Sequence, residues 1–483
     1  MPIASWGGLD TRGGGYNYIK LKSVYNYKEL RMATIYGTVD EDVLSGEESL
    51  GGDVLSGLAG DDLYYSDTNK DKVVESANGG IDKIVLGQMF DFAGLSSYTM
   101  ANNVEDLDIS NISLNDMLHD PVNLEKFVTN GVTVYGNASN NTIYGNLDYG
   151  SYIKIMGGDG NDTILNDLST AEANDYFDGG AGHDTLRGGL GYNTLIGGLG
   201  NDLLVSAAST DILDGGAGDD TYSIVPTEGV FGGPSLIPSI TDSAGIDTIK
   251  VEAYEGTEID LRTIANGQIE NVDASLGTVA PGSFTISGTS VANTLIGKGN
   301  DTNIIYGYGG NDRLIGGEYG DTLYGGDGDD YLDDNSNASA GTLVGGEGND
   351  TYILDAVAVE ALDTITELNG YAGGIDTLKV INGYAFSGTV DLADYANIEN
   401  LDASSHTEGS LTLYGSSANN TLTATSGNDF LQGNGGVDTL IGGAGRDTYY
   451  LTNRAEVIVE ADIERASAIT MDFVGGDKVA VAD

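Results

Sequence analysis

The sequence predicts an all-β solenoid, in which short strands joined by tight turns stack on one another. The main observation is a run of five nine-residue units over residues 179–222, which read GGAGHDTLR, GGLGYNTLI, GGLGNDLLV, SAASTDILD and GGAGDDTYS. The eighth position of each unit is Leu or Tyr, as expected for a three-residue strand whose middle side chain points into a core. A single unit cannot bury that side chain, so the units must stack.

The glycines and carboxylates of each unit predict a cation site in the turn. Glycine permits backbone angles that are closed to other residues, so a GGxG turn can aim its carbonyl oxygens inward. The sixth position adds a carboxylate as Asp184, Asp202, Asp211 and Asp220, with Asn193 in the second unit. Calcium binds about six to eight oxygen ligands of this kind. The alternative is a ladder of glycine-rich turns whose Asp side chains lie at the surface without an ion.

The pattern G-G-x-G-x-D-x-apolar-x resembles the calcium-binding nonapeptide of the RTX, or hemolysin-type, family. The resemblance implies a right-handed parallel β-roll or β-helix solenoid in which two units form one coil. It implies that the cofactor is calcium, with multiple ions, each lying between a turn and the turn one coil later. It also implies type I secretion, with the type I secretion machinery as a partner in transit and an extracellular or cell-surface location.

The composition fits a protein that binds cations. The chain has 74 Asp and Glu against 20 Lys and Arg, a net charge of −54. Such a charge repels nucleic acid and anionic membranes and opposes compaction unless counter-charge is bound. The chain has no cysteine, so no disulfide staples the fold. No apolar run approaches the roughly 18 residues of a membrane helix, so we expect no membrane insertion.

The repeats recur in blocks that are separated by a second kind of module. Each module carries the marker Gly-Ile-Asp, at residues 80–82, 245–247 and 374–376, and a further Asp follows 26 residues after the marker Asp. This constant spacing indicates three related modules that continue the solenoid with longer coils. The predicted segments are an N-terminal segment (1–35), degenerate block 1 (36–66), module 1 (67–135), block 2 (136–222), module 2 (223–287), block 3 (288–352), module 3 (353–413), block 4 (414–450) and a C-terminal segment (451–483).

The N-terminal segment differs from the acidic body of the chain. Residues 1–35 contain five of the 20 basic residues, interleaved with Trp6 and several tyrosines. One interpretation is a cap over the open first coil, because terminal repeats of solenoids are atypical. The other is an assembly segment that docks on an acidic surface.

The candidate calcium ligands are the turn glycines and the sixth-position carboxylates of the blocks. Blocks 2 to 4 each begin with a unit that holds Asn141, Asn293 or Asn420 instead, where we expect weak or absent calcium binding. The predicted ligands are Asp53, Asp62, Gly158, Gly160, Asp162, Asp175, Gly180, Gly182, Asp184, Gly189, Gly191, Gly198, Gly200, Asp202, Asp211, Gly216, Gly218, Asp220, Asp301, Gly310, Asp312, Gly317, Asp321, Gly326, Gly328, Asp330, Gly346, Gly348, Asp350, Asp429, Gly436, Asp438, Gly443, Gly445 and Asp447.

The C-terminal segment resembles a known terminal sequence. Residues 471–481 read MDFVGGDKVAV, which is similar to the end of the C-terminal β-roll domain of serralysin-type proteases. The resemblance implies a secretion-signal region in 451–483. The chain either ends naturally here or is part of a longer protein.

No catalytic motif stands out. The three histidines, His119, His183 and His406, are far apart in the sequence, and neither HExxH nor GxSxG is present. We therefore expect no enzyme, but a secreted calcium-binding structural protein that forms or decorates a surface layer (S-layer), filament or adhesive matrix. Its expected partners are further copies of itself and a cell-surface polysaccharide. One alternative is the secretion and folding part of a larger RTX toxin, protease or adhesin. Another is a polysaccharide-acting parallel β-helix enzyme.

Overall fold

The structure is a computed structural model, and its two compact units are Met1–Lys250 and Val251–Asp483. The boundary falls inside the predicted module 2. The described residues are 17–20, 34–45, 52–66, 70–77, 79–86, 97–109, 132–145, 152–166, 174–225, 237–251, 258–264, 267–275, 283–299, 302–335, 339–355, 363–367, 373–381, 388–406, 409–453, 455–460, 468–471 and 481–482.

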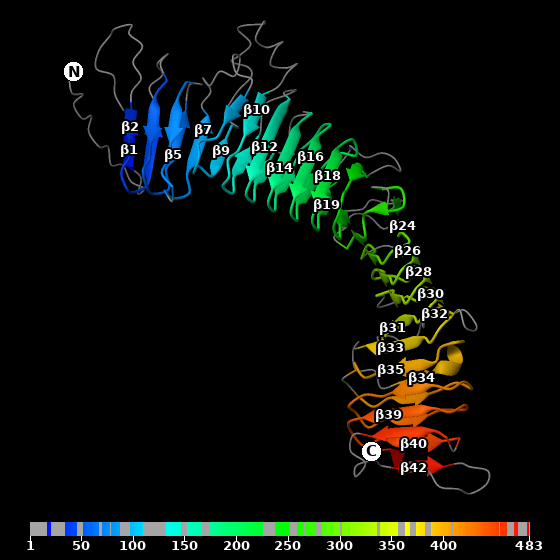
Figure 1. Cartoon of the computed structure of the whole chain (residues 1–483). Coiled ribbons are helices and arrows are strands. Elements are labelled where there is room, and N and C mark those ends of the chain that lie inside the picture. The colour runs from blue at the N-terminus through cyan, green and yellow to red at the C-terminus, as the bar shows by residue number, and fades with distance from the viewer. Residues whose placement is uncertain are drawn as a thin grey trace, which may run out of the picture. The chain divides into compact units, whose positions relative to one another are not determined.

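The described strands of the first unit run parallel in three sheets (Figure 1). The long sheet contains β1(Asn17–Lys20), β3(Asp42–Ser45), β5(Leu63–Ser66), β7(Lys83–Leu86), β9(Asp106–Asp108), β11(Thr142–Tyr144), β13(Thr163–Leu165), β15(Thr185–Arg187), β17(Leu203–Ser206), β19(Thr221–Ile224) and β21(Thr248–Val251). The second sheet contains β8(Ser97–Thr99), β10(Val132–Tyr135), β12(Ile153–Asp159), β14(Tyr176–Ala181), β16(Thr194–Leu199), β18(Ile212–Ala217) and β20(Ser239–Thr241). The third sheet contains β2(Thr34–Tyr36), β4(Val54–Ser56) and β6(Lys72–Val74).

The second unit repeats this plan. Its long sheet contains β23(Asn271–Asp273), β25(Thr294–Ile296), β27(Arg313–Ile315), β29(Tyr331–Asp333), β31(Thr351–Asp355), β33(Thr377–Ile381), β35(Asn400–Asp402), β37(Thr421–Thr423), β39(Thr439–Gly443), β41(Val457–Glu460) and β43(Val481–Ala482). A further sheet contains β22(Glu258–Asp260), β24(Ser283–Ser287), β26(Thr302–Gly309), β28(Thr322–Asp327), β30(Thr342–Glu347) and β32(Thr364–Thr366). The last sheet contains β34(Thr389–Asp391), β36(Thr412–Tyr414), β38(Phe430–Gln432), β40(Thr448–Leu451) and β42(Ala468–Met471), and the 3-10 turn η2(Leu392–Asp394) follows β34.

The strand register confirms a parallel solenoid with two nonapeptides in each coil. Leu195 of β16 lies beside Leu213 of β18, and Leu186 of β15 lies beside Leu204 of β17. Each residue thus pairs with the residue two units later in the sequence. The modules continue the same stack, because β7 pairs with β5 on one side and with β9 on the other.

The core is a file of inward side chains at the eighth position of each unit. Leu186, Leu195, Leu204, Leu213 and Tyr222 are completely buried. The strand neighbours of Leu186 and Leu204 are only partly buried, as expected when successive side chains point to opposite faces of a strand. Burial of this row of side chains holds the coils together through the hydrophobic effect, and no single unit can bury its own side chain.

Glycine allows the turns to stack closely. Gly198 has φ of 114°, and a methyl group built on it would overlap the backbone carbonyl of Gly180 one coil earlier. Another residue would be strained by the backbone angle and would also push the coils apart. Repetition of this glycine therefore follows from the coil spacing.

The described part of the N-terminal segment belongs to the solenoid. Strand β1 pairs in parallel with β3 of block 1. This pairing is what the cap interpretation expects, since the segment adds a strand to its own first coil. Among the described residues, no helix is long and apolar enough to cross a membrane.

Candidate metal centre

The sixth-position carboxylates are buried in the turns and form a ladder along the solenoid. The backbone N–H of Asp162 donates to Oδ1 of Asp184 at 2.6 Å, that of Asp184 to Oδ1 of Asp202 at 2.7 Å, and that of Asp202 to Oδ1 of Asp220 at 2.7 Å. Each of these four residues is at most 2% exposed. One carboxylate oxygen therefore links neighbouring coils, and the second oxygen remains for another partner.

Successive turns lie alternately at two edges of the coil, and we name them by the strand that follows. Odd-strand turns lead into odd-numbered strands, as the turn with Asp184 leads into β15. Even-strand turns lead into even-numbered strands, as the turn with Asn193 leads into β16 and the turn with Asp211 into β18. Because two nonapeptides form one coil, consecutive units fall alternately into the two kinds.

The odd-strand turns contain buried carboxylate oxygens that no hydrogen bond reaches within the described residues. In each case the backbone ladder uses Oδ1, and Oδ2 is the unsatisfied atom. The residues concerned are Asp62, Asp162, Asp184, Asp202, Asp220, Asp312, Asp330, Asp350 and Asp438. A buried polar atom without a partner is costly, so this row calls for a ligand that the protein itself does not supply.

Backbone carbonyls border the same spaces. A methyl group built on Gly157 would overlap Oδ2 of Asp162 and would lie 2.5 Å from the carbonyl oxygen of Gly179, one coil later. The same arrangement recurs at Gly307, which lies between Oδ2 of Asp312 and the carbonyl of Gly325. A carboxylate oxygen and a carbonyl oxygen thus face each other across a space that only glycine leaves open. This donor set fits calcium, which prefers a mixture of such oxygens.

Burial makes the ionised form of these carboxylates unfavourable. It raises the pKa of Asp162, Asp202, Asp312 and Asp330 to about 7, and neighbouring carboxylates add to the shift at Asp162, Asp202 and Asp330. Desolvation and like charge are the two conditions that a bound divalent cation relieves. The electrostatics of the odd-strand turns therefore agree with the geometry.

Several even-strand turns meet the same need with side chains and backbone of the protein. Oδ2 of Asp175 accepts from Nδ2 of Asn166 at 2.7 Å, and Oδ2 of Asp211 accepts from Oγ of Ser206 at 2.6 Å. Oδ2 of Asp429 accepts from Oγ1 of Thr425 at 2.7 Å. These carboxylates are hydrogen-bonded within their own turns, so they offer a cation less than their odd-strand counterparts do.

Amide side chains replace the carboxylate in several other turns. Nδ2 of Asn193 donates to the carbonyl of Gly189 at 3.3 Å in an even-strand turn. In the odd-strand turns that begin blocks 3 and 4, Nδ2 of Asn293 donates to the carbonyl of Glu270 at 2.9 Å, and Nδ2 of Asn420 to that of Glu399 at 3.0 Å. The amide hydrogens thus point at carbonyl oxygens of the kind that would otherwise face a cation. This contact supports the prediction of weak or absent binding at the Asn units.

The predicted glycine ligands lie in the described turns, and all except Gly317 have a positive φ in the left-handed region. The backbone N–H of Gly317 instead donates to Oδ2 of Asp321. Asp447 accepts the N–H of Asp429 at 2.7 Å, and the N–H of Asp53 donates to Oδ1 of Asp71 at 2.9 Å. Asp301 lies outside the described residues. The assignment of individual ligands stays a prediction.

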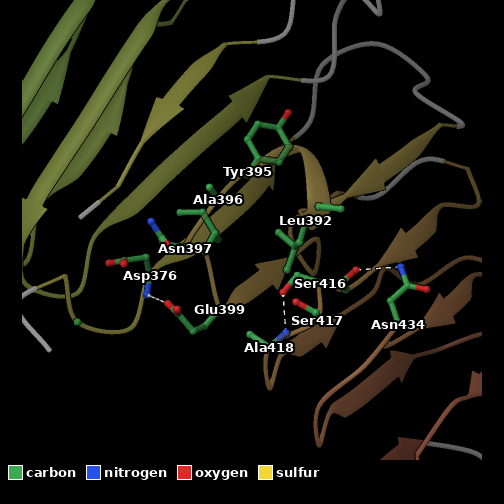
Figure 2. A pocket seen from close by; sticks show the side chains of 14 residues that line it. Asp376, Leu392, Tyr395, Ala396, Asn397, Glu399, Ser416, Ser417, Ala418 and Asn434 are labelled. Carbon is green, nitrogen blue, oxygen red and sulfur yellow. Dashed lines mark hydrogen bonds between the residues drawn. The ribbon is translucent and has the colours of Figure 1, made fainter. Parts of the chain in front are cut away.

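A polar cavity of about 730 Å³ lies between module 3 and block 4 of the second unit. Figure 2 shows Asp376, Asn397 and Glu399 on one side of it, and Ser416 with Ser417 on the other. The backbone N–H of Asp376 donates to Oε2 of Glu399 at 2.9 Å. The Glu399 side chain is thus held by the backbone of Asp376.

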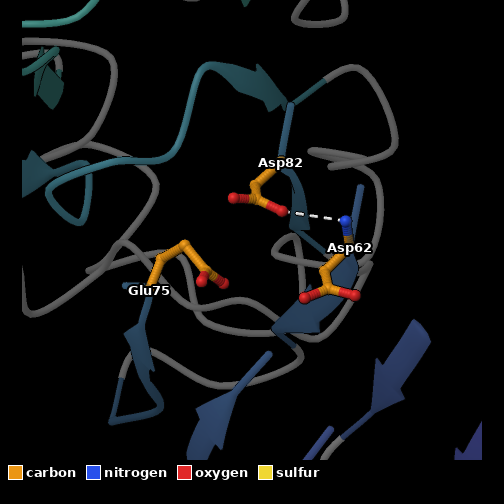
Figure 3. A group of neighbouring side chains, drawn as sticks. All are labelled: Asp62, Glu75 and Asp82. Atoms are coloured by element: carbon orange, nitrogen blue, oxygen red, sulfur yellow. Dashed lines mark hydrogen bonds between the residues drawn. The ribbon is translucent and has the colours of Figure 1, made fainter. Parts of the chain in front are cut away.

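Sequence reasoning missed three clusters of buried acidic residues, which combine a block Asp with two residues of the following module. Within each cluster, oxygens of all three carboxylates lie within 4.8 Å of one another, so each could hold an ion. Figure 3 shows the first of them. The clusters are Asp62–Glu75–Asp82, Asp220–Asp242–Asp247 and Asp350–Glu367–Asp376. The Asp of the Gly-Ile-Asp marker belongs to each cluster, and this recurring Asp was the available sequence signal.

Comparison with protein families identifies the repeats. Seven segments match the RTX calcium-binding nonapeptide repeat (4 copies), at residues 132–149, 154–165, 166–195, 188–222, 306–333, 337–356 and 414–449. A search of curated proteins gave no match. RTX repeats bind calcium, and proteins that carry them are typically secreted. The matched segments contain most of the odd-strand turns with an unsatisfied carboxylate oxygen. The chain therefore contains multiple copies of the RTX calcium-binding nonapeptide repeat, and these repeats form a parallel β-solenoid.

Proposed function

We propose that the protein is a secreted structural component of a surface layer, filament or adhesive matrix, and that calcium folds it and allows it to assemble. The observation that carries the proposal is the row of buried, unsatisfied carboxylate oxygens at the odd-strand turns. In a chain with a net charge of −54, this row opposes compaction until cations bind. Binding energy then becomes folding energy, because the sites do not exist in the unfolded chain.

The proposed location follows from the same coupling. Weak extracellular calcium sites are filled only where calcium is abundant, which is outside the cell. A chain that stays unfolded before it meets calcium suits passage through a type I secretion channel, and it would fold on arrival. The role proposed is mechanical rather than catalytic, with other copies of the chain and a cell-surface polysaccharide as partners.

The test is calcium-dependent assembly of the full chain. Purified protein should be monomeric in chelator and should form larger species in calcium, measured by light scattering and by electron microscopy of the same samples. Magnesium at the same concentration is the control, since it demands a stricter octahedral geometry and retains its water. Protein that folds in calcium but remains monomeric at all concentrations would contradict the structural role.

A further inference from the structure

The three acidic clusters share one construction, which differs from that of the repeated turns. Each joins the last Asp of a block, an acidic residue just after an even-numbered strand, and the Asp of the next Gly-Ile-Asp marker. The block Asp and the marker Asp are linked by the same ladder bond, from Asp62 N–H to Oδ1 of Asp82 at 2.8 Å in the first cluster. The added acid, Glu75 in that cluster, brings a third carboxylate into the turn (Figure 3).

A buried tyrosine holds the added acid in each cluster. The hydroxyl of Tyr222 donates to Oδ1 of Asp242 at 2.8 Å, and the hydroxyls of Tyr64 and Tyr352 donate to Oε2 of the added glutamates in their clusters. All three tyrosines are completely buried. They occupy the eighth position of a unit, where most other units have Leu or Ile. The contact gives these three tyrosines a role, because the hydroxyl orients the third carboxylate.

Unsatisfied oxygens point into these clusters. Oδ2 atoms of Asp62 and Asp82 have no donor among the described residues, and both residues are at most 2% exposed. In the third cluster, a methyl group built on Gly345 would overlap Oδ2 of Asp350, which is also unsatisfied, together with Oε2 of Glu367. The space beside Gly345 is thus bordered by oxygens of two different carboxylates.

We propose that the three clusters are junction sites, a second class of calcium site that binds more tightly than the repeated turns and closes each block. The proposal rests on the calcium-dependent function proposed above. Affinity for calcium rises with the number of charged ligands, and a junction site brings three carboxylates within reach of one ion. The ion would also connect three stretches of chain, because the ladder partners are 20, 27 and 26 residues apart.

The third junction site has a route for ion exchange. Asp376 belongs to the cluster and also lines the cavity of about 730 Å³ between module 3 and block 4 (Figure 2). Nδ2 of Asn397, at the wall of this cavity, donates to the backbone carbonyl of Glu367 at 3.1 Å. We therefore expect this junction site to exchange its ion fastest.

Calcium calorimetry on the full chain tests the proposal. The junction variant carries Glu75→Gln, Asp242→Asn and Glu367→Gln, which remove one charge from each cluster and keep an acceptor for each tyrosine. The control variant carries Glu41→Gln, Glu258→Gln and Glu318→Gln, which remove the same charge from exposed positions. The expected result is loss of the three tightest binding events in the junction variant only. An unchanged tight phase in that variant would overturn the junction sites.

A second measurement applies even if the triple variant does not fold. Terbium replaces calcium in oxygen sites and emits when a nearby tyrosine is excited. Tyr352→Phe keeps the buried ring and loses the hydroxyl that touches Glu367. In a terbium titration of Tyr352→Phe, the emission from the first ions bound should fall by the contribution of one of the three junction sites. Tyr306→Phe, which changes a tyrosine in an aromatic stack with Tyr324, should leave this emission unchanged. Equal emission in wild type and Tyr352→Phe would refute an ion at this cluster.

These outcomes separate the two proposals. Wild-type protein that shows no calcium binding would overturn the proposed function together with the junction sites. Wild-type protein that binds calcium, with a junction variant that keeps every tight event, would overturn the junction sites alone.

Discussion

Within residues 174–222, two edges of one coil have the same nine-residue spacing and different chemistry. On the odd-strand edge, Asp184, Asp202 and Asp220 each keep one buried oxygen without a donor. On the even-strand edge, Asp211 is bonded by Ser206, and Asn193 takes the place of an Asp. The comparison teaches that repetition of the motif does not make every copy an equivalent cation site. A turn is available to a cation when it supplies no hydrogen-bond donor for the second oxygen of its carboxylate.

The largest effect is expected when calcium is removed, because this leaves every odd-strand carboxylate without a counter-charge at once. In excess chelator at neutral pH the chain should be largely unfolded by circular dichroism, and added calcium should restore the β-signal. A chelated sample with the same spectrum and melting temperature as the calcium form would show that neither edge depends on the ion.

Protons should partly replace calcium at the buried carboxylates. Burial raises the pKa of Asp162, Asp202 and Asp312 from 3.8 to about 7, so the folded state holds protons that the unfolded state has released. This contribution to stability is present at low pH and is lost as the pH rises through about 7. Chelated protein should therefore gain β-signal when the pH is lowered from about 8 to about 5, a range that includes the raised pKa of about 7. A loss of β-signal on acidification would contradict the assignment of buried, uncompensated carboxyls.

A matched pair of substitutions addresses the two edges directly. Asp202→Asn keeps an oxygen for the N–H of Asp184 but removes the charge beside the cation space, so calcium affinity should fall roughly tenfold or more. Asp211→Asn makes the same chemical change on the other edge. It should weaken the bond from Ser206 and cost about 1 kcal/mol of folding stability with little change in calcium affinity. Equal losses of affinity, measured by calorimetry, would mean that the edges are equivalent.

The smallest effect is expected at the N-terminal end, away from the best turns of both edges. Deletion of residues 1–33 removes β1, which pairs with β3, and spares β2. As a cap, the segment should contribute a few degrees to the melting temperature in calcium and nothing to assembly. A truncated protein that folds normally but stays monomeric by light scattering would instead support the assembly interpretation.

Much of the fold could be predicted from the sequence because it depends on local features. The nine-residue period, with glycine turns and Leu at the eighth position, was enough to predict a stack of short strands, and the structure confirms it. The constant spacing of the Gly-Ile-Asp modules likewise predicted that they continue the stack, as β7 and β33 do. Each of these inferences requires only the backbone freedom of glycine and the need to bury an apolar side chain.

The tertiary structure decided which carboxylates accept a second hydrogen bond and which keep an unsatisfied oxygen. Asp202 and Asp211 occupy the same place in the motif, and only the folded coil shows that Ser206 reaches one of them while the other has no donor. Glu75 and Asp82 similarly meet Asp62 only because a longer coil brings them back to the same turn. The spacing of the repeats determines which strand each residue belongs to. The identity of its neighbours across a coil depends on the length and path of the chain between them, which the repeat pattern does not contain.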